Sequence, residues 1–234
     1  WFINASFSYN KSIISLQSTL ISLILIPWDI QKLINLNLIL PNKGYLQTAQ
    51  NFFETIEKKF CSKKVFHSYS KEIAFIEDYA YLIQCLLDLS DATMNTKYRL
   101  MAKKFCDEAV EKFYDKKKKV FQKNEKNKND IFMSPIDISD NTIPNGNSIM
   151  LINFSRLGYM ELANELSISL NGYLNIYKNY MISSLKALDF FNEVNNGKNC
   201  NTEGCKNWKN ILNGFYGWFW SSYGTMDILK LLRF

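Results

Sequence analysis

The chain has 234 residues, 47% of them hydrophobic and 21% charged, and its formal net charge is +6 at pH 7. This composition excludes global disorder, and nine Gly with four Pro are too few for a sandwich or barrel of many short strands. A single histidine excludes a His-rich metal site, so we expect neither a metal nor a cofactor. Five widely spaced cysteines argue against a secreted disulfide framework and favour a cytoplasmic location.

The first 43 residues contain the most apolar stretch, Ser12 to Trp28. Its uninterrupted apolar run is shorter than the roughly 20 residues that a membrane span needs. We therefore expect a buried helix and no membrane association, with a membrane anchor as the alternative.

One helical signature occurs three times along the chain. Each copy has a Tyr, an Ala four residues later, and apolar residues 7, 11 and 15 positions after the Tyr. These offsets trace one stripe on a helix of period 3.6. The copies begin at Tyr45, Tyr98 and Tyr159.

A more apolar helix precedes the second and third copies, at 73–89 and 148–157. A helix that is apolar nearly all round is buried on all sides. The repeated unit is thus predicted to be a hairpin of a buried inner helix and an amphipathic outer helix. The copies are too far apart for a short solenoid repeat, which favours hairpins that close into a ring.

The stretch from Lys112 to Lys128 is rich in lysine and includes four consecutive lysines at 116–119. It lacks the interleaved aromatic and Arg residues of a nucleic-acid surface, so we interpret it as a solvated connection and expect no nucleic-acid partner. Residues 116–143 show no helical stripe, and a short hairpin is predicted there.

Two blocks of the sequence resemble one family. Residues 75–89, FIEDYAYLIQCLLDL, are similar to its LEDYAFLI…LLDL block, and residues 136–149, IDISDNTIPNGNSI, are similar to its KDxxDxAxPSGNS block. Between them, Phe113-Tyr-Asp stands where the family has Phe-Trp-Asp. The family is the thioredoxin-domain-containing one that includes spermatogenesis-associated protein 20, and the resemblance covers about Tyr45 to Phe191.

This resemblance implies an all-α fold of the (α/α) six-hairpin toroid kind, shared with N-acylglucosamine 2-epimerases and many glycosidases. Family members join the toroid to an N-terminal thioredoxin-like domain. This sequence shows no thioredoxin-like segment and three copies of the signature, so we expect an incomplete toroid from the C-terminal part of a longer protein. We divide the chain into a poorly matched N-terminal helical segment (1–43), the toroid domain (44–191) and a tail (192–234).

The candidate catalytic residues are Glu77 and Asp78, adjacent acids at the start of an inner helix. The helix dipole alone explains acids in a first turn. Alternatively, they face the toroid mouth, where the related enzymes place acids. Neighbouring residues on a helix diverge by about 100°, so the two cannot form a glycosidase pair, but one of them can pair with Asp137 or Asp140.

The candidate substrate-binding residues are His67, Asp137, Asp140, Asn147 and Ser148. His67 is the one side chain with an ordinary pKa near neutrality, although a lone loop histidine is more often surface. Asn147 or Ser148 is expected to cap the inner helix, with Gly146 allowing a positive φ. Such a helix N-terminus also binds anions or sugar hydroxyls.

Two functions of different classes follow, and the sequence leaves open whether the chain is an enzyme. The first is a non-catalytic or regulatory module, normally attached to a thioredoxin-like domain, whose partner is that domain. The alternative is a carbohydrate-active domain, epimerase-like or glycosidase-like, with acids at the toroid mouth and a sugar as ligand.

Overall fold

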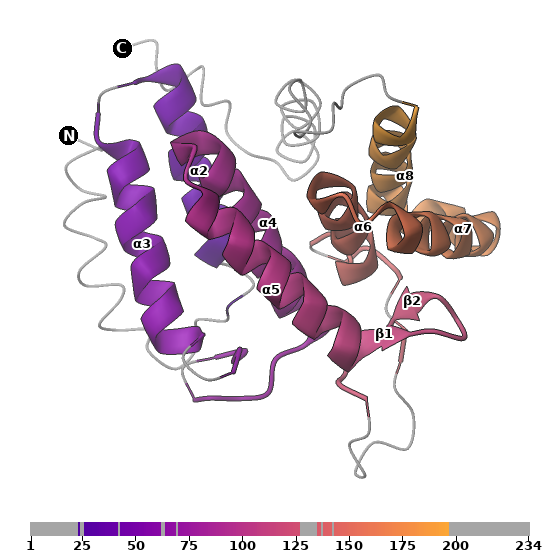
Figure 1. Ribbon diagram of the computed structural model, residues 1–234. Coiled ribbons are helices and arrows are strands. Elements are labelled where there is room, and N and C mark those ends of the chain that lie inside the picture. Colours follow the sequence, from indigo (N-terminus) through magenta and orange to yellow (C-terminus); the bar gives the residue numbers. More distant parts are fainter. Residues whose placement is uncertain are drawn as a thin grey trace.

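The computed structural model describes residues 23, 26–41, 43–61, 64–68, 70–126, 135–136, 138–141 and 143–196. Helix makes up 71% of them, which confirms a mostly helical protein (Figure 1). The α-helices are α2 (Ile26–Ile39), α3 (Tyr45–Phe60), α4 (Ile76–Thr93), α5 (Thr96–Phe113), α6 (Gly146–Leu157), α7 (Met160–Tyr177) and α8 (Ile182–Asn195), with a 3₁₀ turn, η1 (Lys178–Tyr180), before α8.

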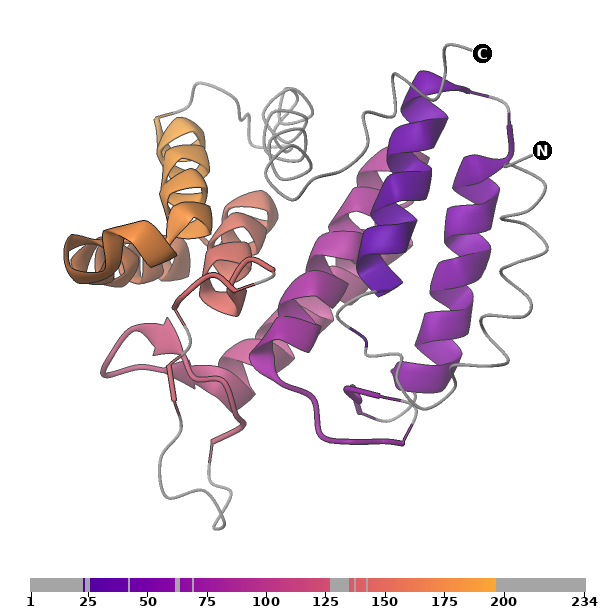
Figure 2. The same ribbon diagram turned by 180° about the vertical axis from the view of Figure 1, so that it is seen from behind.

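Successive helices pair into hairpins, and alternate helices pack on one another. α2 contacts α3, α4 contacts α5, and α6 contacts α7. A second set of contacts joins α2 to α4, α4 to α6 and α6 to α8. The two views in Figures 1 and 2 show α4 between the α2–α3 pair and α6. The even-numbered helices therefore form an inner layer, and α3, α5 and α7 lie outside it.

The repeated stripe forms the buried face of the outer helices, as predicted. Its Ala residues are fully buried, and most of its larger apolar residues are buried with them. Phe52 is half-buried, because Phe53 turns inward in its place, and Tyr45 and Tyr159 at the start of two copies are half-buried as well. The buried positions of the stripe are Ala49, Ile56, Phe60, Tyr98, Ala102, Phe105, Ala109, Phe113, Ala163, Leu166, Leu170 and Leu174.

The inner helices α4 and α6 are buried on all sides, which confirms the second prediction from periodicity. Every residue of α4 from Ile76 to Ser90 is buried, as is every residue of α6 from Gly146 to Arg156. Both helices differ slightly from the predicted ranges. α4 begins three residues later, and α6 begins two residues earlier.

The inner helices run parallel to one another. Gly146 at the start of α6 lies against Ile76 at the start of α4, and Arg156 near the end of α6 pairs with Asp88 near the end of α4. The starts of α6 and α8 also meet, where the Ser148 and Ser184 hydroxyls are 2.7 Å apart. The N-terminal ends of α4, α6 and α8 therefore lie at the same end of the structure.

A buried ion-pair network joins α4 to α6 at the opposite end. Arg156 Nη1 lies 2.8 Å from Asp88 Oδ1, and Nη2 lies 2.7 Å from Asp91 Oδ2. The Arg156 and Asp88 side chains are each 3% exposed. The Arg99 guanidinium on α5 also donates to the Arg156 carbonyl at 2.6 Å, so the network ties three helices together.

A short hairpin with two residues in each strand follows α5, and it begins two residues before the predicted range of 116–143. β1 (Tyr114–Asp115) pairs antiparallel with β2 (Val120–Phe121), and the four lysines of 116–119 form the exposed turn. The stretch Ser12–Trp28 lies almost entirely outside the described residues. Within the described part of the chain, no helix is both long and apolar enough to cross a membrane.

We expect Asp88→Ala to lower the free energy of unfolding by about 3–5 kcal/mol, because it leaves the Arg156 charge buried with less compensation. The matched control is Asp29→Ala, whose ion pair with Lys32 is exposed and should be worth about 0–1 kcal/mol. Urea unfolding followed by circular dichroism measures both. Equal losses in the two variants would show that the buried network does not hold α4 to α6.

Candidate functional site

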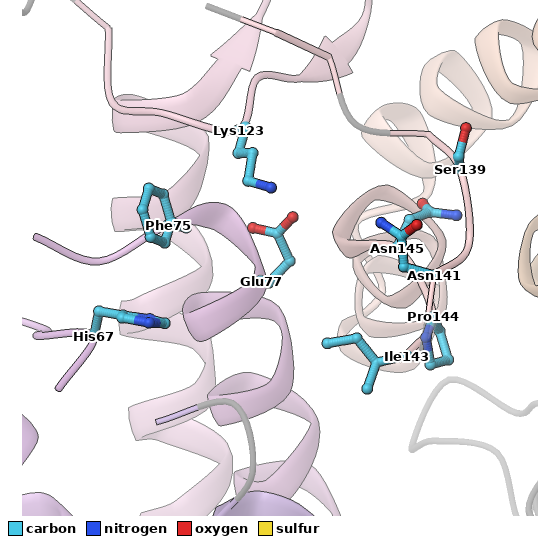
Figure 3. A pocket seen from close by; sticks show the side chains of 9 residues that line it. All are labelled: His67, Phe75, Glu77, Lys123, Ser139, Asn141, Ile143, Pro144 and Asn145. Carbon is cyan, nitrogen blue, oxygen red and sulfur yellow. The ribbon is translucent and has the colours of Figure 1, made fainter. Parts of the chain in front are cut away.

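A cavity of about 230 Å³ lies where the N-terminal ends of α4 and α6 meet three loop segments (Figure 3). Glu77 comes from α4, and the other lining residues come from the loop before α4, from the segment after β2 and from the loop before α6. The lining residues are His67, Phe75, Glu77, Lys123, Ser139, Asn141, Ile143, Pro144 and Asn145.

The two acids at the start of α4 have separate environments. The Asp78 carboxylate is fully buried and accepts a hydrogen bond from the Phe75 amide at 2.8 Å, which caps the helix. Glu77, one residue earlier and about 100° away around the helix, lines the cavity and is 7% exposed. The two side chains diverge as predicted, so Asp78 caps the helix and Glu77 faces the cavity.

Gly146 lets the two helix starts come together. A Cβ atom at this position would lie 3.2 Å from Ile76 Cγ2, which is tighter than most Cβ contacts, and 3.4 Å from Glu77 Cγ, at the short limit of ordinary contact. Gly146 does not adopt the positive φ that a glycine allows, since the glycines with positive φ among the described residues are Gly44 and Gly158. Close helix approach, and not a left-handed backbone, explains a glycine beside Glu77.

His67 lies in a tight loop that the backbone fixes on two sides. Its amide donates to the Glu72 carbonyl at 2.9 Å, and its carbonyl accepts from the Leu23 amide at 2.7 Å. Nδ1 of the ring lies 3.0 Å from each oxygen of the Asp78 carboxylate. This hydrogen bond raises the pKa of His67 above its ordinary value, against a smaller opposing effect of burial.

Lys123 reaches the cavity because its backbone is joined to two of the neighbouring segments. The Lys123 carbonyl accepts from the first amide of α4, at Ile76 (3.1 Å), and its own amide donates to the Pro135 carbonyl (2.9 Å). The side chains of Lys123 and Glu77 point toward one another in Figure 3. The cavity therefore combines a carboxylate with an ammonium group.

The loop before α6 is held by a network around Asn145. The Asn145 side-chain amide donates to Asp140 Oδ1 at 2.8 Å and to the Ile138 carbonyl at 3.0 Å. Asp140 Oδ2 in turn accepts from the Ser183 amide at 2.7 Å, which anchors the loop to the start of α8. The hydrogen bonds of Asn145 and Asp140 therefore hold the loop that forms this wall of the cavity.

The structure brings two of the predicted site residues, His67 and Glu77, to the cavity. Asp78 lies behind His67 and bonds to it, and Asp140 bonds to Asn145 and Ser183. Asp137 lies outside the described residues.

Asn147 and Ser148 are buried and hold other elements. The Asn147 side chain accepts from the Phe121 amide at 2.8 Å and donates to the Phe121 carbonyl at 3.0 Å, which attaches β2 to α6. The residue that caps α6 is Asn145, whose Oδ1 accepts from the Ser148 amide at 3.0 Å. The expectation that Asn147 or Ser148 is the cap was therefore wrong by two or three residues, because helical geometry starts at Gly146.

Sequence reasoning missed the other seven cavity residues, which are Phe75, Lys123, Ser139, Asn141, Ile143, Pro144 and Asn145. Lys123 belongs to the lysine-rich stretch that was interpreted as a solvated connection. The stretch follows α5 in the chain, and its backbone hydrogen bonds to Ile76 and Pro135 join it to the start of α4 and to the segment before α6. The backbone hydrogen bonds that bring them together are long-range and leave no local pattern.

The described residues hold no group of three or more His, Cys, Asp or Glu side chains suited to a metal ion. Burial raises the pKa of the Cys61 and Cys106 thiols to about 12, so neither thiol is a nucleophile near neutral pH. The chain matches no family model and no curated protein.

Gly146→Ala should destabilise the protein by about 1–3 kcal/mol, because the new methyl group meets Ile76, which is itself fully packed. Gly172→Ala is the matched control. It lies inside α7 with open space around it, so it should stabilise the protein by about 0.5–1 kcal/mol. Thermal unfolding measures both changes, and a stabilised Gly146→Ala variant would contradict the close approach.

The imidazole of His67 should titrate at a higher pH in the folded protein than in the urea-unfolded chain. Because the folded pKa is the higher one, the His67–Asp78 pair stabilises the fold fully below the unfolded pKa of about 6.5. This contribution is lost as the pH rises through the folded pKa. The chain has one histidine, so NMR of its ring gives the pKa directly, and His67→Gln should remove this part of the pH dependence of unfolding. Equal pKa values in the two states would refute the pairing.

Proposed function

We propose that the cavity at the start of α4 and α6 binds a small neutral polyhydroxylated compound of the sugar class, as part of a carbohydrate-active domain. The observation that carries this proposal is the mixture of groups around the cavity. Glu77 accepts hydrogen bonds, Lys123 donates them, and the Asn141 side chain does both. Vicinal hydroxyl groups are matched by this alternation of acceptors and donors.

The cavity also has an apolar side, formed by Phe75, Ile143 and Pro144. A sugar ring presents C–H groups between its hydroxyls, and aromatic and aliphatic side chains cover such faces. The volume of about 230 Å³ falls below the roughly 300–1,000 Å³ of pockets for drug-sized ligands. The size therefore favours a single sugar unit over a longer chain.

The charges of the cavity favour a neutral ligand. Lys123 and the helix N-termini attract an anion, but Glu77 opposes it and Asp78 already occupies the start of α4. A cation is attracted by Glu77 but repelled by Lys123. A neutral compound with hydroxyl groups can hydrogen-bond to both Glu77 and Lys123, and neither charge repels it.

Among the described residues that line the cavity, Glu77 is the one carboxylate. Glycoside hydrolysis normally requires two carboxylates on either side of the scissile bond. Asp78 and Asp140 already accept hydrogen bonds that maintain the fold, from Phe75 and His67 and from Asn145 and Ser183. These contacts favour binding over hydrolysis.

We also propose that the hairpins belong to an (α/α) toroid. The inner helices α4, α6 and α8 are parallel and neighbours in chain order, with the outer helices returning the chain between them. That arrangement supports a curved double layer with all inner N-termini at one mouth, where the cavity lies. The other function inferred from sequence, a non-catalytic module for a thioredoxin-like domain, stays a prediction that rests on the sequence resemblance.

Binding of D-glucose, D-mannose, D-galactose and myo-inositol, measured by saturation-transfer NMR and isothermal titration, tests the sugar proposal. For a compound that binds, Glu77→Gln should weaken affinity at least about tenfold, because it removes a charge-assisted hydrogen bond worth about 1.5–3 kcal/mol. Glu161→Gln is the matched control, since it makes the same change in the exposed first turn of α7.

Lys123→Met should weaken the same binding, and Lys117→Met in the exposed hairpin turn should not. Inorganic phosphate serves as the competing ligand. Phosphate binding that needs Lys123 and improves in Glu77→Gln would identify an anion site and reject the proposal. The proposal also fails if none of the four compounds binds at millimolar concentration.

A further inference from the structure

His67 and Asp78 form a fixed pair at the edge of the cavity. Asp78 is fully buried, and both of its oxygens lie 3.0 Å from Nδ1 of the ring. The ring also packs edge-on against Phe75, with 5.2 Å between the ring centroids. The backbone bonds of His67 to Glu72 and Leu23 hold the loop, so the imidazole has little freedom to rotate.

This pairing determines which ring nitrogen carries the proton in neutral His67. A buried carboxylate is an acceptor only, so the hydrogen belongs on Nδ1. The lone pair then lies on Nε2, the ring nitrogen that Asp78 does not bind. Because the ring lines the cavity, neutral His67 offers a ligand a hydrogen-bond acceptor.

The charged groups around His67 come from several segments. Asp78 and Glu77 lie on α4, and Glu72 lies on the same loop as His67, and all three favour the protonated ring. Lys123 approaches from the segment after β2, on the far side of Glu77 in Figure 3. The ring therefore titrates with a pKa above its ordinary value, inside a cavity that already contains one carboxylate and one ammonium group.

We infer that His67 is a specificity-determining contact, whose Nε2 accepts a hydrogen bond from a ligand hydroxyl only while the ring is neutral. The inference rests on the proposed sugar function and deepens it. Protonated His67 carries a hydrogen on both ring nitrogens, so its Nε2 can no longer accept a hydrogen bond from the ligand hydroxyl. The ligand must present hydroxyl donors to His67 and Glu77 and an acceptor oxygen to Lys123. Binding is thereby strong at alkaline pH and weak at acidic pH.

The test measures affinity for the best-binding compound of the four between pH 5 and pH 8.5, alongside the NMR titration of His67 in the same protein. The dissociation constant should rise as the pH falls through the pKa of His67, by up to about tenfold in all, which is the worth of one neutral hydrogen bond. Deoxy analogues of the same sugar should identify one hydroxyl whose removal abolishes this dependence.

Two variants separate the role of His67 from a general effect on folding. In His67→Gln the side-chain amide retains an acceptor oxygen, so binding should persist but lose its dependence on pH. Glu72→Gln removes an exposed charge that favours protonation, so the midpoint of the binding curve should move to lower pH. Circular dichroism of the two variants is the control that checks whether they fold.

An affinity that stays constant from pH 5 to pH 8.5 would overturn the role of His67 and leave the sugar site intact. So would a midpoint that does not move with the NMR pKa in Glu72→Gln. Failure of all four compounds to bind at every pH rejects the proposed function itself, and the two failures are therefore distinguishable.

Discussion

The burial of α4 and α6 on all sides is the constraint on which the rest of the structure depends. A helix with no solvent face cannot leave a polar side chain to water, so each one must find a partner within the protein. The Asn153 amide donates to the Ala80 carbonyl, Asn147 bonds to both backbone groups of Phe121, and Arg156 pairs with Asp88. These bonds determine which elements lie next to the two helices.

The same constraint explains why the cavity forms at the N-terminal end. Along their length, α4 and α6 are in contact with each other and with α2, α5, α7 and α8. Where the helices start, the loops before α4 and α6 and the segment after β2 lie beside them, and these loops leave room for a cavity among side chains. The parallel course of α4 and α6 brings their starts together, and Gly146 lets them approach closely enough for Glu77 to share a wall with Asn145.

The outer stripe and the buried inner helices could be predicted because both depend on periodicity within one segment. Glu77 and His67 could be selected as candidates by residue type, and the geometry of a helix correctly separated Glu77 from Asp78. Lys123 could not be selected, since its position depends on backbone bonds to Ile76 and to Pro135. The function of Gly146 was also not visible, because close approach depends on a partner 70 residues away in sequence.

The adjacency of Glu77 and Asp78 connects the fold to the proposed function. One carboxylate is turned inward, where it caps α4 and orients His67, and the other is turned toward the cavity beside Lys123. Exchanging the two side chains would change little in size but would leave the capping carboxylate one methylene too long. Asp78 therefore caps α4, while the neighbouring Glu77 supplies a carboxylate to the cavity. The same capping carboxylate lies 3.0 Å from Nδ1 of His67, so the helix cap and the position of the imidazole depend on one side chain.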